Sequence, residues 1–437
     1  MSFLSRLKGS VSNIPPSIGI WLAYVPFGIR LGKQYIDFKR KAQAMPCKDA
    51  LFAEMYSLVS RAAQDIPFYR HHYHQVGFDY NALKSFDDLP QIPIVRKEDL
   101  QHFLLRDRVF TSNKGIITNT GGTSGQPLDL VLDTNAYAQE WSHMHTIWEN
   151  LGYKPSSIKL TLRGMNLGVK PLKYNFIHNE FQVNAYCDFD LVIKSLDKTL
   201  AKYKVEYLHG YPSGIYEFIK LLKSKAPDVL EKLLKNLKGV FFGSEYPAPI
   251  YRNYIEGILK VPTISWYGHT EMAVLACEKS EPFVYYPFQS YGFTESVEID
   301  GKQHLVGTTL HNSIGPLIRY DTGDLIEPIS YKDGVLESFK VAEGRIGEFV
   351  IDTNGRSIPL TALIFGRHHK LFEVADFVQV HQKNPGVLIV IVTTQSADIN
   401  CDELFDAEGV NMNIIFKLVK QPYKTKSGKV SLLVKNI

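Results

Sequence analysis

A run of ten small, polar and hydroxyl-bearing residues, Thr118 to Pro127 (TNTGGTSGQP), constrains this chain most strongly. It has too few apolar side chains to build a core strand or helix. Its glycines let backbone N–H groups turn towards an anion without a Cβ clash, and its Thr and Ser hydroxyls add neutral donors. The run therefore predicts either a phosphate-binding loop or an ordinary surface loop. Neither G-x-G-x-x-G nor the Walker pattern fits it, so another kind of nucleotide site must be considered.

Length and composition are those of a globular protein with a large core, since 45% of the 437 residues are hydrophobic and 22% are charged. The formal net charge of +4 is small for this length and no basic-aromatic module occurs, so we expect no nucleic-acid partner. Cys47, Cys187, Cys277 and Cys401 are far apart and show no C-x-x-C spacing. Neither a zinc site nor a disulfide framework is predicted, and free thiols fit the cytoplasm.

The apolar segment Ile14 to Ile29 is too short and too broken by proline and glycine to cross a bilayer. A signal peptide is not indicated, because basic Arg30 follows in place of a small-residue cleavage site. Two interpretations stay open. The segment is either an arm packed on its own domain or a weak membrane-surface contact with Trp21, Tyr24 and Phe27 as an interfacial belt.

Apolar periodicity predicts an α/β fold for the larger part of the chain. We expect helices over 35–44 and 50–66, with Asp49 as candidate N-cap of the second, then a strand over 128–132 and a helix over 135–151. Short strands alternate with helices from 158 to 242, which is typical of a parallel sheet, and strands predominate from 283 to 339.

A smaller α+β unit is expected after a boundary near 345–348. It should hold strands over 349–351, 377–382 and 387–393, a turn at 354–355, a helix over 361–368 and a hairpin-like end. The predicted organisation is therefore a large domain with β/α sheets over residues 1–344 and a small domain over residues 345–437.

Four more short polar segments follow the glycine-rich run: Ser265 to Glu271 (SWYGHTE), Arg319 to Asp324 (RYDTGD), Gly344 to Glu348 (GRIGE) and Lys424 to Lys429 (KTKSGK). Together the five segments resemble the motifs of the adenylate-forming superfamily of acyl-CoA synthetases, luciferases and peptide-synthetase adenylation domains. Those motifs run Thr/Ser/Gly-rich loop, Y-G-x-T-E, T-G-D, G-R-x-x-D and a terminal G-K. Order and spacing match over nearly the whole chain. The resemblance implies an AMP- and acyl-binding domain over 1–344 and a mobile lid over 345–437.

ATP-dependent activation of a carboxylic acid requires that the polyphosphate, a divalent cation and the ribose are held in place. The resemblance implies that the phosphates are held by Thr120, Gly121, Gly122, Thr123, Ser124 and Gly125. It further implies that Thr270 bonds the α-phosphate and that Glu271 binds Mg²⁺, a hard cation that prefers oxygen ligands. The alternative for Glu271 is a charge that complements a helix N-terminus.

Asp324 matches the family carboxylate that accepts both ribose hydroxyls, the alternative being a turn residue at a strand end. Arg345 resembles a ribose or phosphate contact, because its guanidinium stays charged. Tyr267, followed by Gly268, would stack on the base, although an aromatic after a core strand is often packing. The adenine-side segment is expected at Ser244, Glu245 and Tyr246.

Lys429 matches the family lysine that bridges carboxylate and phosphate oxygens during adenylation, whereas an ordinary lysine near a chain end is solvated. One position departs from the family pattern. The hinge residue is usually Asp and sometimes Lys, and here it is Glu348. The longer acid should still allow rotation, but the two-state domain movement is less directly implied than the site.

The segments Gly210 to Ser213 and Gly243 to Glu245, with the short chain, resemble the phenylacetate-CoA ligase group, especially its members associated with capsular polysaccharide biosynthesis. Aromatic walls enclose a small carboxylic acid, and the pocket residues are expected to be His143, His145, Trp148, His209, Tyr211, Trp266 and His269. Helical spacing makes His143 and Trp148 equally good core residues.

These expectations describe an ATP-dependent acid–CoA ligase with ATP and Mg²⁺ as cofactors and CoA as co-substrate. A second interpretation replaces CoA with a sugar or amino-acid acceptor in surface-polysaccharide biosynthesis, since no pantetheine-tunnel motif is recognisable. A third is an inactive nucleotide-binding homologue, against which intact Glu271, Asp324 and Lys429 argue. We expect the protein in the cytoplasm, or at the inner face of the membrane if the N-terminal arm makes the surface contact.

Overall fold

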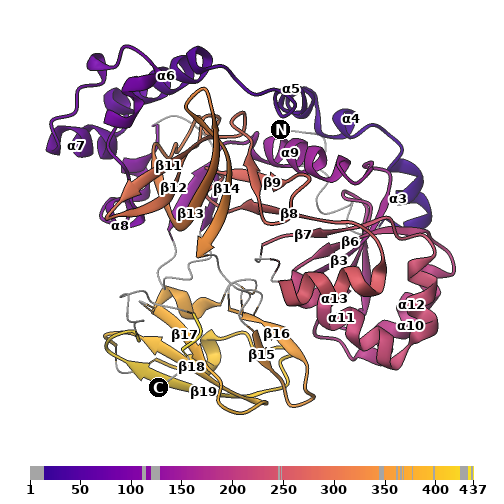
Figure 1. The fold of residues 1–437 in the computed structure, drawn as a ribbon. Helices are drawn as coiled ribbons and strands as arrows, with labels where there is room; N and C mark the ends of the chain where they lie inside the picture. Colours follow the sequence, from indigo (N-terminus) through magenta and orange to yellow (C-terminus); the bar gives the residue numbers. More distant parts are fainter. Residues whose placement is uncertain are drawn as a thin grey trace.

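The computed structural model describes residues 14–110, 115–119, 128–244, 247, 249–343, 349–360, 363–364, 367, 369–375, 377–396, 399–423, 432–434 and 437. Its central element is a 12-stranded sheet with the order β11-β12-β13-β14-β10-β9-β8-β7-β6-β3-β5-β4 (Figure 1). The predicted mixed α/β fold, with a large sheet domain followed by a smaller C-terminal unit, is confirmed.

One half of this sheet is parallel and carries the predicted β/α alternation. Its strands are β3 (Ile158–Met165), β5 (Glu180–Asn184), β6 (Val205–Gly210), β7 (Gly239–Phe242) and β8 (Thr263–Gly268), with β4 (Leu172–Asn175) antiparallel at the edge. The helices of this half are α10 (Phe189–Leu200), α11 (Pro212–Lys225), α12 (Pro227–Leu234) and α13 (Pro249–Leu259).

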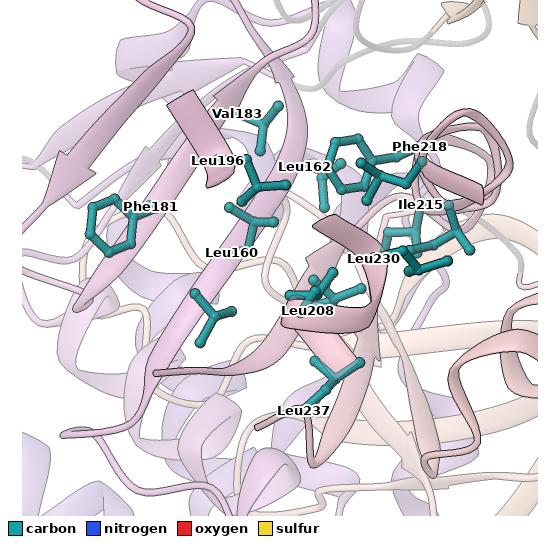
Figure 2. Close-up of a cluster of buried hydrophobic side chains, with 14 of the residues drawn as sticks. Leu160, Leu162, Phe181, Val183, Leu196, Leu208, Ile215, Phe218, Leu230 and Leu237 are labelled. Carbon is teal, nitrogen blue, oxygen red and sulfur yellow. The ribbon is translucent and has the colours of Figure 1, made fainter. Parts of the chain in front are cut away.

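These helices cover the sheet because they share an apolar core with it. Leu160 and Leu162 of β3 and Leu208 of β6 meet Leu196 of α10, Ile215 and Phe218 of α11 and Leu230 of α12 (Figure 2). Each fully buried side chain of this kind contributes about 2 kcal/mol relative to exposure. The core holds the carboxyl ends of the parallel strands at one edge, where ligands bind in open α/β sheets.

The other half of the sheet is antiparallel. It consists of β9 (Leu275–Glu278), β10 (Tyr285–Pro287), β11 (Phe293–Ile299), β12 (Lys302–Thr308), β13 (Tyr320–Lys332) and β14 (Val335–Glu343). The strands expected over 283–339 are therefore present. Because β8 pairs antiparallel with β9, the direction of the sheet changes directly after the Y-G-x-T-E segment.

The remaining helices of the larger part precede or flank the sheet. They are α3 (Pro16–Leu22), α4 (Phe27–Leu31), α5 (Lys33–Lys41), α6 (Lys48–Asp65), α7 (Pro67–Gln75), α8 (Lys97–Gln101) and α9 (Ala136–Glu149), with 3₁₀ turns at Tyr80–Ala82, Phe86–Gln91 and Leu105–Arg108. The predicted N-cap of α6 is wrong: Cys47 is the N-cap, and Asp49 lies in the first turn, where it complements the helix dipole. No helix in the described ranges is long and apolar enough to span a membrane.

A short hairpin flanks the glycine-rich run. β1 (Ile116–Asn119) pairs antiparallel with β2 (Asp129–Leu132), and Asn119 lies opposite Asp129. The predicted order of loop, strand and helix is confirmed here, with β2 and then α9 following the run. Residues 120–127, which join the two strands, lie outside the described residues.

The C-terminal unit has its own sheets and core. It contains β15 (Phe349–Ile351), β16 (Ser357–Pro359), β17 (Phe377–His381), β18 (Val387–Thr393), β19 (Asn413–Val419), α14 (Cys401–Leu404) and the 3₁₀ turn Lys370–Glu373. The expected hairpin-like end is wrong, because β19 pairs parallel with β18 after a connection through α14. Of the helix expected over 361–368, residues 361–362, 365–366 and 368 lie outside the described residues, as does the predicted boundary near 345–348.

Candidate active site

Two of the predicted motifs meet through a hydrogen bond. Tyr267, near the end of β8, donates from Oη to Asp324 Oδ2 at 2.5 Å, although 57 positions separate the two residues in the chain. The carboxyl end of β8 and the T-G-D turn of β13 therefore form one site. The hydroxyl fixes the orientation of the carboxylate that we expect to receive the ribose.

The T-G-D turn is built by local hydrogen bonds. Gly323 adopts a φ of +74°, a conformation that favours glycine. Its N–H donates to Asp321 Oδ1 at 2.9 Å, and the Asp324 N–H donates to Thr322 Oγ1 at 3.2 Å. The Thr322 hydroxyl in turn donates to Leu305 O on β12 at 2.8 Å. These contacts present the Asp324 side chain to Tyr267.

Glu271 lies in the turn after β8, and both of its carboxylate oxygens accept hydrogen bonds. His269 Nδ1 is 3.0 Å from Oε2, and the Tyr320 hydroxyl donates to Oε1 at 3.4 Å. A carboxylate only accepts, so His269 must carry its hydrogen on Nδ1. Burial, followed by the charge of Glu271, raises the pKa of Tyr320, which stays a donor. Sequence reasoning missed Tyr320, although it immediately precedes the D-T-G-D segment.

The predicted Mg²⁺ ligand has the chemistry that this cation requires. Across the described parts of the chain, no group of three or more His, Cys, Asp or Glu side chains could hold a metal ion. Mg²⁺ is commonly held by one or two carboxylates together with substrate phosphates and water, so a single oriented carboxylate is a suitable donor set. Glu271 would anchor the ion, and its ligation stays a prediction.

Three of the predicted pocket residues form one aromatic cluster. The Trp148 ring stacks on Phe241 at 4.8 Å and lies 5.1 Å from His209 and 6.0 Å from Trp266. Trp148 is fully buried and forms the rear of the cluster, whereas Trp266 is partly exposed. Gly243 makes this arrangement feasible, because a Cβ there would approach Trp266 Cζ2 to 2.2 Å.

Two buried imidazole nitrogens border this region without a hydrogen-bond partner in the described residues. They are His209 Nδ1 and His269 Nε2. A buried polar atom without a partner costs about 1–3 kcal/mol, and such atoms often mark a ligand position. Trp148 Nε1 and core atoms such as Tyr73 Oη share this property, so a pocket role for His209 and His269 stays a prediction. Tyr211 is half-buried at the start of α11, and Ser244 is exposed with a φ of +67°.

His143 lies apart from the aromatic cluster, whereas the His145 ring lies 5.9 Å from the Trp148 ring. His143 Nδ1 lies 2.9 Å from Gln139 O, and its ring packs edge-on against Phe288 and Tyr291. Burial lowers the pKa of His143 to about 4. The Tyr35 hydroxyl is 2.8 Å from His145 Nδ1, which ties α5 to α9. These contacts suit core residues, and a substrate role for His143 stays a prediction.

Sequence reasoning missed a buried charged cluster beside the pocket. Glu180 of β5 accepts a hydrogen bond from Thr161 at 2.7 Å, and Thr161 lies opposite His209 in the sheet. Lys159 is completely buried, and its Nζ donates to Tyr153 Oη at 2.9 Å and to His178 O at 2.6 Å. The signal was present in β3, where Lys159 and Thr161 alternate with apolar residues.

Attraction between the positive Lys159 and the negative Glu180 stabilises this buried cluster. Burial alone would raise the pKa of Glu180, but the positive Lys159 and the neighbouring imidazoles lower it to about 2. Burial lowers the pKa of Lys159 to about 8, so the amine remains mostly charged at neutral pH. Glu180 therefore contributes stability above its unfolded pKa, and this contribution is lost as the pH falls towards 2.

Several predicted site residues lie outside the described residues, and their contacts stay predictions: Thr120, Gly121, Gly122, Thr123, Ser124, Gly125, Glu245, Tyr246, Arg345 and Lys429. The chain on both sides of Lys429 is nevertheless placed. Tyr423 exchanges two hydrogen bonds with the Gln379 side chain, at 2.8 and 2.9 Å. The Val380 N–H donates to Leu432 O at 2.7 Å, and the Val434 N–H donates to Val380 O at 2.8 Å. Both flanks are therefore held on β17.

Solved structures share this architecture. The structure of 2-hydroxyisobutyryl-CoA ligase with 2-HIB-AMP and CoA in the thioesterification state has a TM-score of 0.54 at 17% identity and covers 90% of this chain and 91% of that chain. The postadenylation state of the same ligase with R3-HIB-AMP has a TM-score of 0.53 at 17% identity and covers 89% of each chain. This chain therefore shares its overall fold with that CoA ligase.

One curated relative is similar to this chain in sequence. Indoleacetate–lysine synthetase of Pseudomonas savastanoi is 23% identical over 386 residues, which cover 82% of this chain and 88% of the relative. No protein-family model matches the chain.

Proposed function

We propose that this protein is an AMP-forming ligase that activates a small carboxylic acid with ATP and then transfers the acyl group to CoA. One observation carries the proposal: the Tyr267–Asp324 hydrogen bond joins the Y-G-x-T-E and T-G-D segments beside an oriented Glu271. The shared fold with a ligase solved with an acyl-AMP and CoA supports it. The oriented carboxylates argue against an inactive nucleotide-binding homologue.

In the proposed first step, a carboxylate oxygen of the acid attacks the α-phosphorus of ATP, and the bond to pyrophosphate breaks. Asp324 would accept the ribose hydroxyls, and Glu271 would hold Mg²⁺, which would supply positive charge to the phosphates. Lys429, Thr270 and the 120–125 loop compensate the negative charge that develops on the phosphate oxygens. In the second step, the thiolate of CoA attacks the acyl carbon and AMP leaves.

The acid pocket is proposed between Trp266, His209 and the turn that carries His269. Trp148 and Trp266 supply aromatic surface, and His209 Nδ1 is a buried polar atom without a partner among the described residues. The ring of an aromatic acid would pack on the two tryptophans, and one hydrogen-bonding group on that acid would pair with His209 Nδ1. This agrees with the proposed likeness to the phenylacetate-CoA ligase group.

A second candidate keeps the adenylation step but replaces CoA with an amine or sugar acceptor. The named activity of the curated relative favours it, because that synthetase joins an acid to lysine. The proposed association with capsular polysaccharide biosynthesis belongs to this candidate. Mass spectrometry of the product with CoA, amino acids or amino sugars as acceptor separates the two.

The exchange of pyrophosphate into ATP tests the shared first step. Aryl, hydroxyaryl, short fatty and amino acids should be screened, with exchange that depends on the acid and on Mg²⁺ as the expected result. Glu271→Gln should lower exchange by about two orders of magnitude or more, because the metal loses its charged anchor. Glu231→Gln, an exposed change on α12, is the matched control. Unchanged exchange in a folded Glu271→Gln protein would refute the metal role.

A further inference from the structure

The first two helices of the described chain carry an exposed apolar surface, the arm patch. Its members are Ile18, Trp21, Tyr24, Val25 and Ile29, of which Trp21, Tyr24 and Ile29 are 72–73% exposed. Nowhere else in the described residues do five exposed large apolar side chains fall within twelve consecutive positions. A concentration of this kind marks an interaction site more often than single exposed residues do.

The arm patch is held in place by buried contacts. Phe27 is 5% exposed and packs with Leu31, Tyr35 and Ala138, so the prediction that Phe27 belongs to an interfacial belt is wrong. Arg30 lies over the Phe27 ring at 4.6 Å and donates to three backbone carbonyls, of Val25, Ala23 and Ile177. The corner between α3 and α4 is therefore fixed while its outer side chains face solvent.

The positive charge of residues 1–36 favours an anionic partner. The first 36 residues contain four basic side chains, Arg6, Lys8, Arg30 and Lys33, and no acidic one. These four equal the formal net charge of the whole chain, +4, so the remainder is balanced. Lys33, Arg40 and Lys41 are exposed and follow the patch in the sequence, and Asp37 among them pairs with Arg40 at 3.8 Å. A second copy of this chain would bring like charges together, which opposes a symmetric dimer through this surface.

We propose that the arm patch binds the surface of a bilayer that contains anionic lipids. Trp and Tyr have apolar bodies and polar tips that suit the headgroup layer. Each basic residue near an anionic surface adds about 1 kcal/mol, and an apolar patch combined with basic residues supplies the two signals that stable binding requires. In Figure 1, α3 and α4 lie at the upper right of the molecule and β15 to β19 at the bottom.

Sedimentation of the full chain with vesicles tests the proposal. We expect binding to mixed phosphatidylglycerol and phosphatidylcholine vesicles that weakens as salt rises, and much weaker binding to phosphatidylcholine alone. The triple variant Trp21→Ser, Tyr24→Ser, Ile29→Ser should lose at least about tenfold in affinity, because it removes most of the inserted apolar surface. A blue shift of tryptophan emission on binding should disappear in Trp21→Phe.

The matched control replaces three exposed apolar residues elsewhere, Tyr331→Ser, Val374→Ser and Leu418→Ser. It should bind vesicles like the parent, and thermal unfolding should show both triple variants folded. Equal binding by the two triple variants, or no vesicle binding by the parent, would overturn the proposal. If the parent forms a dimer but does not bind vesicles, and only the arm-patch variant loses the dimer, the occupant of the arm patch is a second copy of this chain.

Discussion

The Tyr267 hydroxyl holds Asp324 in one orientation within the protein itself. Each carboxylate oxygen has two lone-pair positions, so Asp324 can accept ribose hydroxyls while it keeps the 2.5 Å bond to Tyr267. Tyr267 was expected to stack on the base. In the structure its hydroxyl also orients Asp324, which a phenylalanine side chain could not do.

Tyr267→Phe separates these two tasks, because it keeps the ring and removes the hydroxyl. We expect the KM for ATP in pyrophosphate exchange to rise about three- to tenfold, which corresponds to the loss of one orienting hydrogen bond. Tyr267→Leu, which also removes the ring, should raise it further. A parental KM in Tyr267→Phe together with a raised KM in Tyr267→Leu would show that stacking alone matters.

At single residues, the sequence predicted roles but not the contacts that orient the side chains, and the roles stay predictions. Glu271, Asp324 and Tyr267 stand in short local patterns that indicate a role without knowledge of the fold. The Tyr320 hydroxyl on Glu271 and the pairing of Thr161 with His209 depend on sheet register. A register between strands far apart in the chain has no local signal, so these partners could not be predicted.

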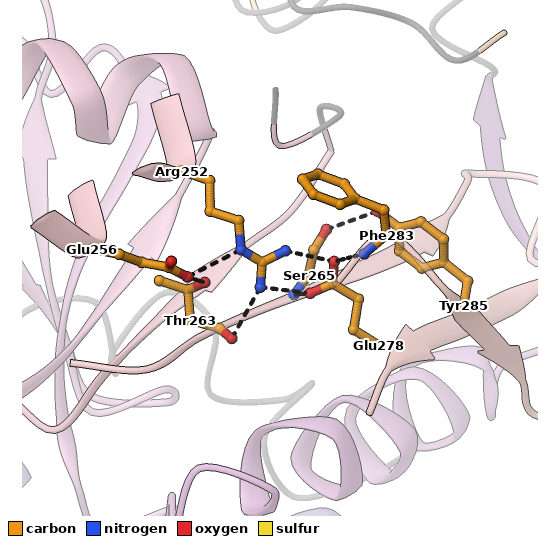
Figure 3. Close-up of polar contacts among 7 residues, drawn as sticks. All are labelled: Arg252, Glu256, Thr263, Ser265, Glu278, Phe283 and Tyr285. Carbon is orange, nitrogen blue, oxygen red and sulfur yellow. Dashed lines mark hydrogen bonds and ion pairs between the residues drawn. The ribbon is translucent and has the colours of Figure 1, made fainter. Parts of the chain in front are cut away.

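Among the elements, β8 is held in place by a buried charge network (Figure 3). Arg252 of α13 donates to both oxygens of Glu278 on β9, at 2.7 and 3.0 Å, and to Glu256 at 3.0 Å. Glu278 also accepts the backbone N–H of Ser265 at 2.8 Å. Ser265 lies on β8 two residues before Tyr267, so the network fixes the strand that presents Tyr267.

Glu278→Gln should lower the free energy of unfolding by about 3–5 kcal/mol, because it leaves the buried Arg252 charge with only the partly exposed Glu256 as a carboxylate partner. Glu256→Gln is the control. The Glu256 side chain is 40% exposed, and we expect a loss of about 1 kcal/mol or less. Urea unfolding of both variants measures the difference. Similar losses in the two variants would show that burial of the pair is not the decisive factor.

Strands were predicted where the apolar period was regular, as in β15 and β18, whose predicted bounds the structure matches. The pairing of β19 was not predicted correctly. An apolar run such as that of β19 fits a hairpin as well as a parallel partner, and only the crossover through α14 decides between them.

At the scale of the whole molecule, the chain consists of two parts with separate cores. A substitution of Lys429 tests which half-reaction depends on the C-terminal part. Lys429→Ala should reduce pyrophosphate exchange by about two orders of magnitude or more, because a cation near the developing charge lowers the barrier of that step. The same variant should consume supplied acyl-adenylate and CoA at the parental rate. Equal losses in both half-reactions would contradict the proposed separation of roles.

The attachment of both flanks of Lys429 to β17 sets a physical limit on where its amine can act. Lys429 precedes the anchored Leu432 by three residues, so its Cα stays within about 11 Å of the Leu432 Cα at full extension. Lys429 is therefore tied to β17, and any displacement of Lys429 much larger than this span requires a displacement of β17. The distance between a probe on β17 and a probe on β8, measured during turnover, would therefore report where β17 lies in each half-reaction. This measurement needs no change to Lys429.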